Sequence, residues 1–206
     1  FLKKFNNSQE KFWYSKFGDD YTTRNNSPDL LAASIYMFSK IINCTYGVKS
    51  ILEIGANRGI NYDAFKQIIP ELNFSGIEIN RKAVNELRKK KIEVFHDSVL
   101  DFKSKKKWDL TLSRGVLIHI NPKSLDLCYE KLYEYSKRYI VICEYYNPSP
   151  LELDYRGYKK KLFKRDFAGE MLDKFSDLKL VNYGFCYKRD SNFPQDDINW
   201  FLLEKC

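Results

Sequence analysis

The feature that most limits the fold of this chain is a regular alternation of short apolar segments with longer amphipathic ones. Apolar segments with the length of buried strands occur at 51–54, 74–79, 92–95, 108–113 and 139–144. Apolar residues at helical spacing follow the first, second and fourth of these segments. An alternation of this kind predicts a mainly parallel sheet with helices on both faces.

The segments outside this alternation complete the predicted architecture. Ser27 and Pro28 are typical of a helix start, and another helix is expected at 166–175. Two β-like segments, at 180–187 and 198–203, are expected to form an antiparallel hairpin at the end of the sheet. We therefore predict an α/β fold: a Rossmann-like, seven-stranded, mostly parallel sheet with helices on both faces and a C-terminal antiparallel β-hairpin.

Two parts of the chain are less regular. Residues 1–24 are aromatic and polar without continuous periodicity, and we interpret them as a lid or a short helix. The linker at 146–165 is the part whose structure is hardest to predict. We divide the compact chain into an N-terminal lid and helical segment at 1–47 and a ligand-binding domain at 48–206.

The loop after the first predicted strand has the pattern E-x-G-x-x-x-G, formed by Glu53, Gly55 and Gly59. Glycine lets the backbone pass close to a ligand, and the helix that follows presents unpaired N–H groups. The dinucleotide pattern G-x-G-x-x-G is absent, because Asn57 and Ile60 stand at its second and third glycine positions. A phosphate-binding P-loop is excluded as well, because its Gly-Lys-Ser/Thr is missing.

Carboxylates at the ends of three consecutive strands indicate a nucleoside ligand with a cationic tail. Glu53 is suited to the ammonium group of S-adenosylmethionine (SAM), which has no pyrophosphate and needs no anion cradle. Glu78 can accept both ribose hydroxyls, and Asp97 can accept the adenine amino group. The alternative is that these residues are caps and surface acids. The expected cofactor residues are Glu53, Gly55, Ala56, Asn57, Gly59, Glu78, Ile79, Asp97, Ser98, Ser113, Arg114, Trp13 and Arg24.

Composition limits the partners. A net charge of +8 and a pI near 9.1 favour an anionic partner, such as nucleic acid, a nucleotide-linked sugar or an acidic glycan. Lysine runs at 89–91, 105–107 and 159–161 fit nucleic acid, although solvated helix ends and turns are the commoner explanation.

Five scattered cysteines without a C-x-x-C pair predict reduced thiols, no metal and a cytoplasmic protein. No apolar run approaches the ~20 residues of a membrane span.

The strand, loop and carboxylate pattern resembles the class I SAM-dependent methyltransferases over residues 48–205. A narrower similarity rests on FWYSKFGDDYTTRN at 12–25, RGVLIHINP at 114–122, EYYNPSP at 144–150, YRG at 155–157 and LFKRDFAGE at 162–170. These segments resemble the pseudaminic acid biosynthesis-associated methylases. The resemblance implies SAM as cofactor, S-adenosylhomocysteine (SAH) as product and a nonulosonic (pseudaminic-type) acid of bacterial surface glycans, or its activated form, as acceptor. Tyr158 departs from the family, where a histidine is expected.

Methyl transfer requires alignment and, for a hydroxyl acceptor, removal of a proton. Ligands of open α/β sheets bind at the carboxyl ends of the strands, and His119 follows the fourth strand there. We therefore name His119 as the candidate base; the alternative is a structural histidine that packs on the cofactor. The candidate acceptor residues are Tyr145, Tyr146, Asn147, Tyr155 and Arg156, the last as a clamp for a carboxylate.

Three functions stay open at this level. A small-molecule sugar methyltransferase is favoured, and an RNA methyltransferase that uses the basic loop and a SAM-binding scaffold without turnover are the alternatives. The N-terminal aromatic residues are expected either to close over the ligand or to pack within their own segment. The sequence does not indicate an oligomeric state.

Overall fold

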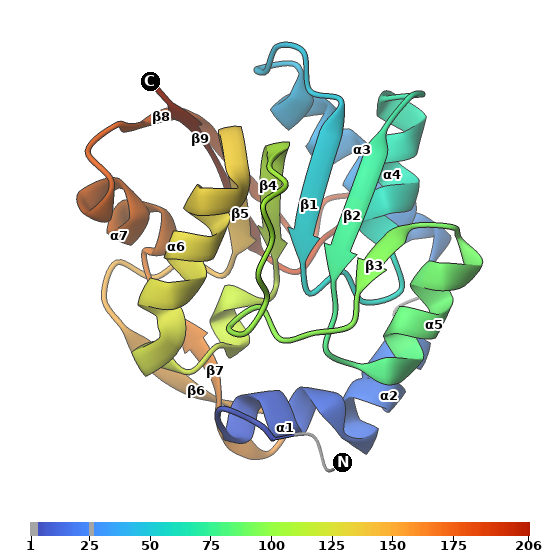
Figure 1. Cartoon of the computed structure of the whole chain (residues 1–206), viewed down its shortest axis with the longest axis vertical. Helices are drawn as coiled ribbons and strands as arrows, with labels where there is room; N and C mark the ends of the chain where they lie inside the picture. Colours follow the sequence, from blue (N-terminus) through green and yellow to red (C-terminus); the bar gives the residue numbers. More distant parts are fainter. Residues whose placement is uncertain (1–3, 25–26) are drawn as a thin grey trace.

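The computed structural model describes residues 4–24 and 27–206. Its centre is a seven-stranded sheet of order β3-β2-β1-β4-β5-β9-β8 (Figure 1). The strands are β1 (Ser50–Ile54), β2 (Asn73–Ile77), β3 (Glu93–Phe95), β4 (Trp108–Arg114), β5 (Ser136–Glu144), β8 (Leu178–Cys186) and β9 (Ile198–Lys205). The first five are parallel, whereas β9 runs antiparallel to both β5 and β8. The predicted Rossmann-like sheet with its C-terminal antiparallel hairpin is therefore confirmed.

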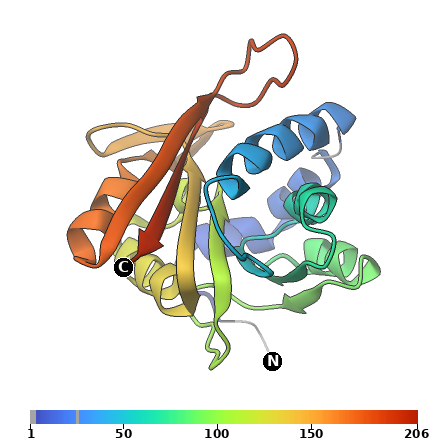
Figure 2. The ribbon, with the colours of Figure 1, turned by 90° about the horizontal axis from the view of Figure 1, so that it is seen from above.

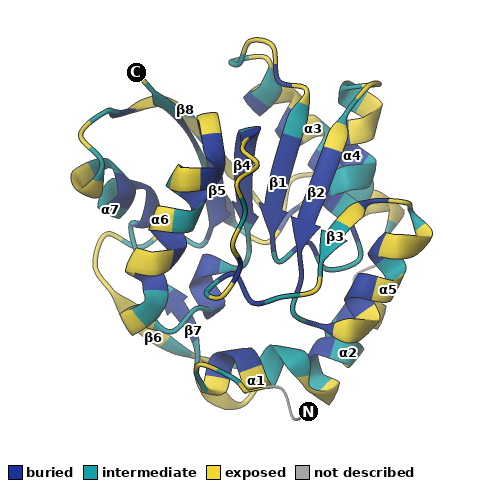
Figure 3. Ribbon diagram, viewed as in Figure 1, coloured by how far each residue is buried: buried dark blue, intermediate teal, exposed yellow. Residues whose placement is uncertain are grey.

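Helices cover both faces of this sheet, as Figure 2 shows from above. One face carries α3 (Pro28–Ile42), α4 (Ile60–Ile68) and α5 (Arg81–Lys89), and the other carries α6 (Leu125–Tyr135) and α7 (Phe167–Lys174). The central strands are buried from both sides (Figure 3). This double burial explains why the parallel strands are continuously apolar instead of alternating with polar residues.

Side-chain caps fix the helix starts. Ser27 accepts a hydrogen bond from the Asp29 amide at the start of α3, and Asn80 accepts one from Ala83 at the start of α5. The helix predicted after the fourth strand has a different start, because a 3₁₀ turn, η2 (Pro122–Ser124), precedes α6. The Asn121 side chain and carbonyl accept from the two amides that follow Pro122, which closes this tighter turn first.

The linker at 146–165 contains an element that the sequence analysis did not predict, a separate hairpin of β6 (Leu151–Tyr155) and β7 (Tyr158–Lys164). Arg156 and Gly157 form its two-residue turn with φ of 50° and 83°. Two consecutive residues with positive φ are typical of the turns that match strand twist. Glycine is ordinary at such a position but arginine is not, so the turn was hard to read from the residues.

The N-terminal segment forms two short helices, α1 (Ser8–Tyr14) and α2 (Lys16–Arg24), below the carboxyl ends of the parallel strands (Figure 1). The Asn7 side chain caps α1 by accepting from two amides. Phe1 to Lys3 of the expected lid, and Asn25 of the first motif, lie outside the described residues. No helix in the described ranges is long and apolar enough to cross a membrane.

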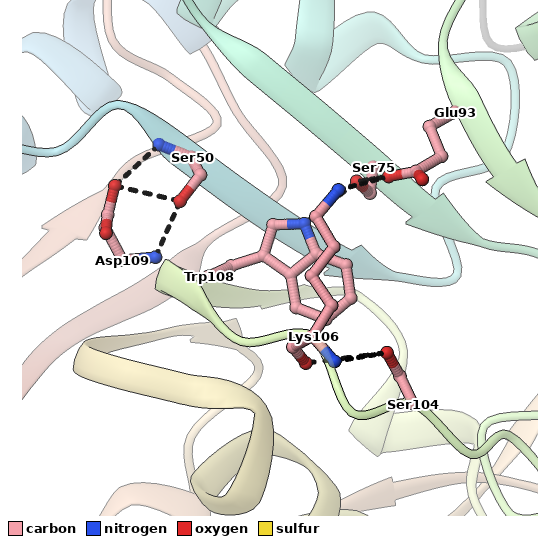
Figure 4. A network of polar contacts seen from close by, with 7 residues as sticks. All are labelled: Ser50, Ser75, Glu93, Ser104, Lys106, Trp108 and Asp109. Carbon is pink, nitrogen blue, oxygen red and sulfur yellow. Dashed lines mark hydrogen bonds and ion pairs between the residues drawn. The ribbon is translucent and has the colours of Figure 1, made fainter.

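A polar network ties the strands together at their other end (Figure 4). The indole of Trp108 donates to Ser75 Oγ over 2.8 Å, and Ser75 in turn donates to Glu93. Beside it, Asp109 accepts from the amide and the hydroxyl of Ser50 at 2.9 and 2.8 Å. Side chains from four neighbouring strands are thereby fixed in register.

Candidate functional site

A cavity of about 480 Å³ lies at the carboxyl ends of β1, β2 and β4. This volume is within the range of small-molecule sites, about 300–1,000 Å³. Helices α1 and α2, the β6–β7 hairpin and the β8–β9 loop contribute further lining residues. The predicted site residues that line it are Trp13, Glu53, Gly55, Ala56, Asn57, Glu78, Ile79, Asp97, Ser98, Arg114, His119, Tyr145, Tyr155 and Arg156.

The glycine loop after β1 forms one wall of the cavity. Gly55 has a φ of 63°, and a Cβ atom there would lie 2.6 Å from a methyl group of Val116. The neighbouring strand also approaches closely, since a Cβ on Gly76 would lie 2.7 Å from the Cβ of Ala56. The two glycines therefore let the loop pack closely against the segment after β4 and against β2, where a side chain would collide.

Glu78 follows β2 and is buried, with both carboxylate oxygens oriented by the backbone. Oε2 accepts from the Asn57 amide and Oε1 from the Asn80 amide, each over 2.7 Å. A carboxylate oxygen can accept more than one hydrogen bond. The geometry therefore holds a carboxylate in place between the glycine loop and the start of α5.

Glu53 is the most deeply buried acid of the cavity, with 1% of its surface exposed. Asn61 of α4 donates to its Oε1, whereas Oε2 has no hydrogen-bond partner among the described residues. The Oδ1 atom of Asn57 is likewise buried without a partner among them. Burial raises the pKa of Glu53 to about 8 against the opposing effects of Asn61 and Arg114. Two buried acceptors in the wall of one cavity are thus left for a ligand that brings hydrogen-bond donors.

Arg114 connects this corner to three other parts of the chain. Its Nη1 atom donates to Asn61 Oδ1 over 2.6 Å and to Ser34 Oγ of α3 over 2.7 Å. Its Nη2 atom donates to Oε1 of Gln195, in the β8–β9 loop, over 2.7 Å. Gln195 is buried and also donates to the carbonyl of Ala33. A guanidinium group is thereby fixed at the same end of the cavity as the Glu53 carboxylate.

Sequence analysis missed Asn61, Ser34 and Gln195. The position of Asn61 offered a signal, because it lies in the first turn of the helix that follows the glycine loop. Ser34 and Gln195 offered none, since nothing local distinguishes a serine on α3 or a glutamine in a polar loop. Their roles depend on contacts with Arg114, which is 80 and 81 residues away.

The N-terminal helices are attached to the cavity wall by polar contacts. Glu10 of α1 is buried and accepts from the Ser98 hydroxyl after β3. The Asn80 side chain donates to the Trp13 carbonyl over 3.1 Å and to Asp19 over 2.9 Å. Asp97 lines the cavity beside Ser98, and the Asp97 carboxylate accepts a hydrogen bond from the Ser98 amide. The helices therefore form one wall of the site.

His119 ends the short 3₁₀ helix η1 (Leu117–His119) and is buried. Its Nδ1 atom lies 2.6 Å from the Lys161 carbonyl on β7, so Nδ1 carries the proton and Nε2 is an acceptor. Burial lowers the pKa of His119 to about 4, which keeps the ring neutral at pH 7. The ring centroids of Trp13 and Tyr155 both lie 4.7 Å from that of His119. The residue therefore joins α1, η1 and the hairpin.

The predicted acceptor residues divide into two groups. Tyr145, Tyr155 and Arg156 line the cavity, and the Arg156 guanidinium lies 5.8 Å from the centroid of the Tyr155 ring. Tyr146 and Asn147 do not line it: Tyr146 is 40% exposed and the Asn147 side chain donates to the nearby Ser149 carbonyl. The backbone of Tyr146 forms a β-bridge with Arg165, and the Asn147 amide donates to the Arg165 carbonyl. These contacts hold the segment beside the end of β7.

Three expected cofactor residues also lie off the cavity. Arg24 is exposed, with its guanidinium 5.7 Å from the Phe17 ring centroid. Gly59 adopts a φ of 78° at the N-cap of α4, where it turns the chain. Ser113 is fully buried and donates to Glu144 over 2.6 Å. Among the described residues, no group of three or more His, Cys, Asp and Glu side chains is arranged to hold a metal ion.

The fold is similar to those of several solved methyltransferases. A 1,6-didemethyltoxoflavin-N1-methyltransferase from Burkholderia thailandensis, with its substrate and SAH bound, matches with a TM-score of 0.72 at 11% identity over 95% of this chain and 86% of that one. The magnesium protoporphyrin IX methyltransferase of Synechocystis PCC 6803 with bound SAH gives 0.70 at 14% identity, over 96% and 97%. The plantazolicin methyltransferase with SAH gives 0.65 at 16% identity, over 96% and 94%.

No protein-family model matches the sequence, and no curated protein matches it. The structural likeness defines the class of fold: the chain has the Rossmann-like fold of the SAM-dependent methyltransferases.

Proposed function

We propose that this chain is a SAM-dependent methyltransferase that releases SAH and methylates a small molecule within the cavity. The observation that carries the proposal is a pair of buried acceptors, Glu53 Oε2 and Asn57 Oδ1, for which residues 4–24 and 27–206 supply no hydrogen-bond partner. They lie in the same cavity wall as the oriented Glu78 carboxylate. A buried acceptor without a partner is costly, and a ligand with an ammonium group and hydroxyl donors relieves that cost. SAM has both.

The residues divide the cofactor between them. In the proposed arrangement Glu53 binds the ammonium and Arg114 the carboxylate of the methionine tail, because the acid and the guanidinium stand at one end of the cavity. The positive charge of a bound ammonium would favour the ionised form of Glu53, whose pKa burial raises. Glu78 accepts hydrogen bonds from the ribose hydroxyls, and Asp97 accepts one from the adenine amino group. Trp13 closes the site from α1. Residues 48–206 then form the cofactor-binding domain, with 1–47 as its lid and helical segment.

Bound SAM would supply a methyl group on a positively charged sulfur, so the protein's own task is to align the acceptor and manage its proton. His119 is neutral at pH 7 and presents Nε2 as an acceptor, so it can take the proton of a hydroxyl, although its lowered pKa makes it a weak base. Tyr145 and Tyr155 line the acceptor side, and Arg156 supplies a planar cation for a carboxylate. We propose a nonulosonic acid, free or CMP-linked, as the acceptor; the motif resemblance and the positive net charge support this choice.

The titration of Glu53 gives a test of the cofactor corner. The pKa of Glu53 is about 8 in the folded protein, and 4.5 is its ordinary value, which applies to the unfolded chain. Between these pH values the folded chain holds a proton that the unfolded chain has lost. Stability therefore falls as pH rises, on the order of 1.4 kcal/mol per pH unit. Glu53→Gln cannot ionise, so we expect it to exceed the wild type in free energy of unfolding at pH 8 but not at pH 4.5.

Urea unfolding at the two pH values measures this difference, and calorimetry measures the accompanying loss of SAH affinity, about tenfold or more. A stability difference that is the same at both pH values would contradict the assigned titration. Unchanged SAH affinity would contradict the ammonium site.

Mass spectrometry tests the acceptor. A panel of nonulosonic acids, free and CMP-linked, is incubated with the protein and SAM, and we expect one of them to gain a single methyl group. Confirmed SAM binding without a methylated sugar would contradict this acceptor class. The remaining alternatives then separate, because RNA binding weakens steeply with salt, whereas a scaffold binds SAM and yields no product from any acceptor.

A further inference from the structure

Glu144, the last residue of β5, is buried at 2% exposure and accepts four hydrogen bonds from a single neighbouring stretch of chain. Its Oε1 atom accepts from Ser113 Oγ over 2.6 Å and from the amides of Val116 and Leu117 over 3.0 Å each. Its Oε2 atom accepts from the Ile118 amide over 3.4 Å. Burial raises the pKa of Glu144 to about 7, and these four donors oppose that rise.

The segment that Glu144 holds, residues 115–119, is part of the cavity wall. Val116 packs against the glycine loop, since a Cβ on Gly55 would touch its methyl group. Three residues further on, His119 faces the cavity. The segment begins at Gly115, with a φ of 65° and its amide bonded to the Cys143 carbonyl. Without the carboxylate, three consecutive amides of this segment would lose their side-chain acceptor beneath the protein surface.

We propose that Glu144 is a positioning residue that holds residues 115–119 between the cofactor loop and the acceptor side of the cavity, and so fixes the place and the tautomer of His119. This inference rests on the proposed function. Glu144 does not itself line the cavity. It acts through the amides and through Ser113, which explains why a serine expected at the cofactor is buried behind the wall instead.

Two histidines in the chain make a direct measurement practical. Long-range ¹H–¹⁵N spectra at pH 8 report the tautomer of each ring, with exposed His96 as the internal reference. In the wild type we expect His119 to hold one tautomer, protonated on Nδ1, because Nδ1 donates to the Lys161 carbonyl. In Glu144→Ala the segment is released, so His119 becomes a mixture of tautomers and the amides of 116–118 exchange faster with deuterium.

Two further variants separate positioning from simple loss of stability. Glu144→Gln keeps one acceptor oxygen for the Oε1 donors and should restore most of the wild-type spectrum. Thr111→Ala is the matched control, because Thr111 is fully buried on the same strand as Ser113 but donates to the Leu132 carbonyl on α6. It should lower stability and leave the His119 tautomer unchanged. Should Glu144→Ala fail to fold, Ser113→Ala and Glu144→Gln carry the same test at smaller amplitude.

Turnover supplies the functional readout. A displacement of the segment by about 1 Å is expected to lower kcat on the order of 100-fold in Glu144→Ala. The affinity for SAH, measured by calorimetry, should change far less, because the hydrogen bonds that hold Glu53 and Glu78 do not involve residues 115–119. A folded Glu144→Ala with a single His119 tautomer and protected amides would overturn the inference. A wild-type protein that does not bind SAH would instead overturn the proposed function. The tautomer measurement does not depend on SAH binding, so the two failures can be distinguished.

Discussion

Replacing Glu78 by alanine is expected to weaken the binding of SAH by about two orders of magnitude or more, because hydrogen bonds to a charged group are worth about 1.5–3 kcal/mol each and a ribose offers two donors. The substitution also removes the acceptor of the Asn57 and Asn80 amides, which form the rim of the same site. Calorimetric titration of the purified variant measures the change.

Glu86→Ala is the matched control for this prediction. Glu86 is an acid on α5 that pairs with Lys89 and does not line the cavity. Its replacement should leave the affinity for SAH unchanged. A Glu78→Ala protein that melts like the wild type and binds SAH equally well would show that Glu78 has only a structural role.

The largest expected effect on stability comes from Trp108. Its side chain is fully buried against α6, and its indole donates to Ser75 within the network of Figure 4. Trp108→Ala should lower the free energy of unfolding by about 3–5 kcal/mol, because it leaves a cavity at the centre of the core. Urea unfolding measures this difference.

Two control variants separate the effect of lost packing from the effect of the lost hydrogen bond. Trp108→Phe fills most of the space and deletes the hydrogen bond, so it should cost about 1–3 kcal/mol. Tyr46→Ala, at a side chain that is 83% exposed, should stay within about 0.5 kcal/mol of the wild type. If Trp108→Ala were as mild as Tyr46→Ala, the core around β4 would not be packed as described.

Sequence analysis predicted those parts of the fold that are determined by residues close together in the chain. The apolar strands and the caps of α3 and α5 are set by neighbouring residues, so their periodicity and spacing predicted the sheet and its terminal hairpin. The β6–β7 hairpin was missed for the opposite reason. Its strands are charged and partly exposed, and its turn uses Arg156 at a positive φ, where asparagine or glycine would give the usual signal.

The candidate site shows the same division. Glu53, Glu78 and Asp97 follow from one rule, that residues after parallel strands meet at one edge, and all three line the cavity. The partners of Arg114 and the carboxylate of Glu144 were not predicted, since each becomes meaningful only when distant segments pack together. Ser113 marks the limit of the rule: it stands at the correct strand end, but its side chain is buried and donates to Glu144 instead of lining the cavity.

A crystal structure of the protein with SAH tests the central claim most directly. The account predicts SAH in the cavity between the glycine loop and α1, with its ribose hydroxyls on Glu78 and its ammonium group within hydrogen-bond distance of Glu53 Oε2. A cavity that stays empty at saturating SAH, or SAH bound with its ribose away from Glu78, would contradict the account.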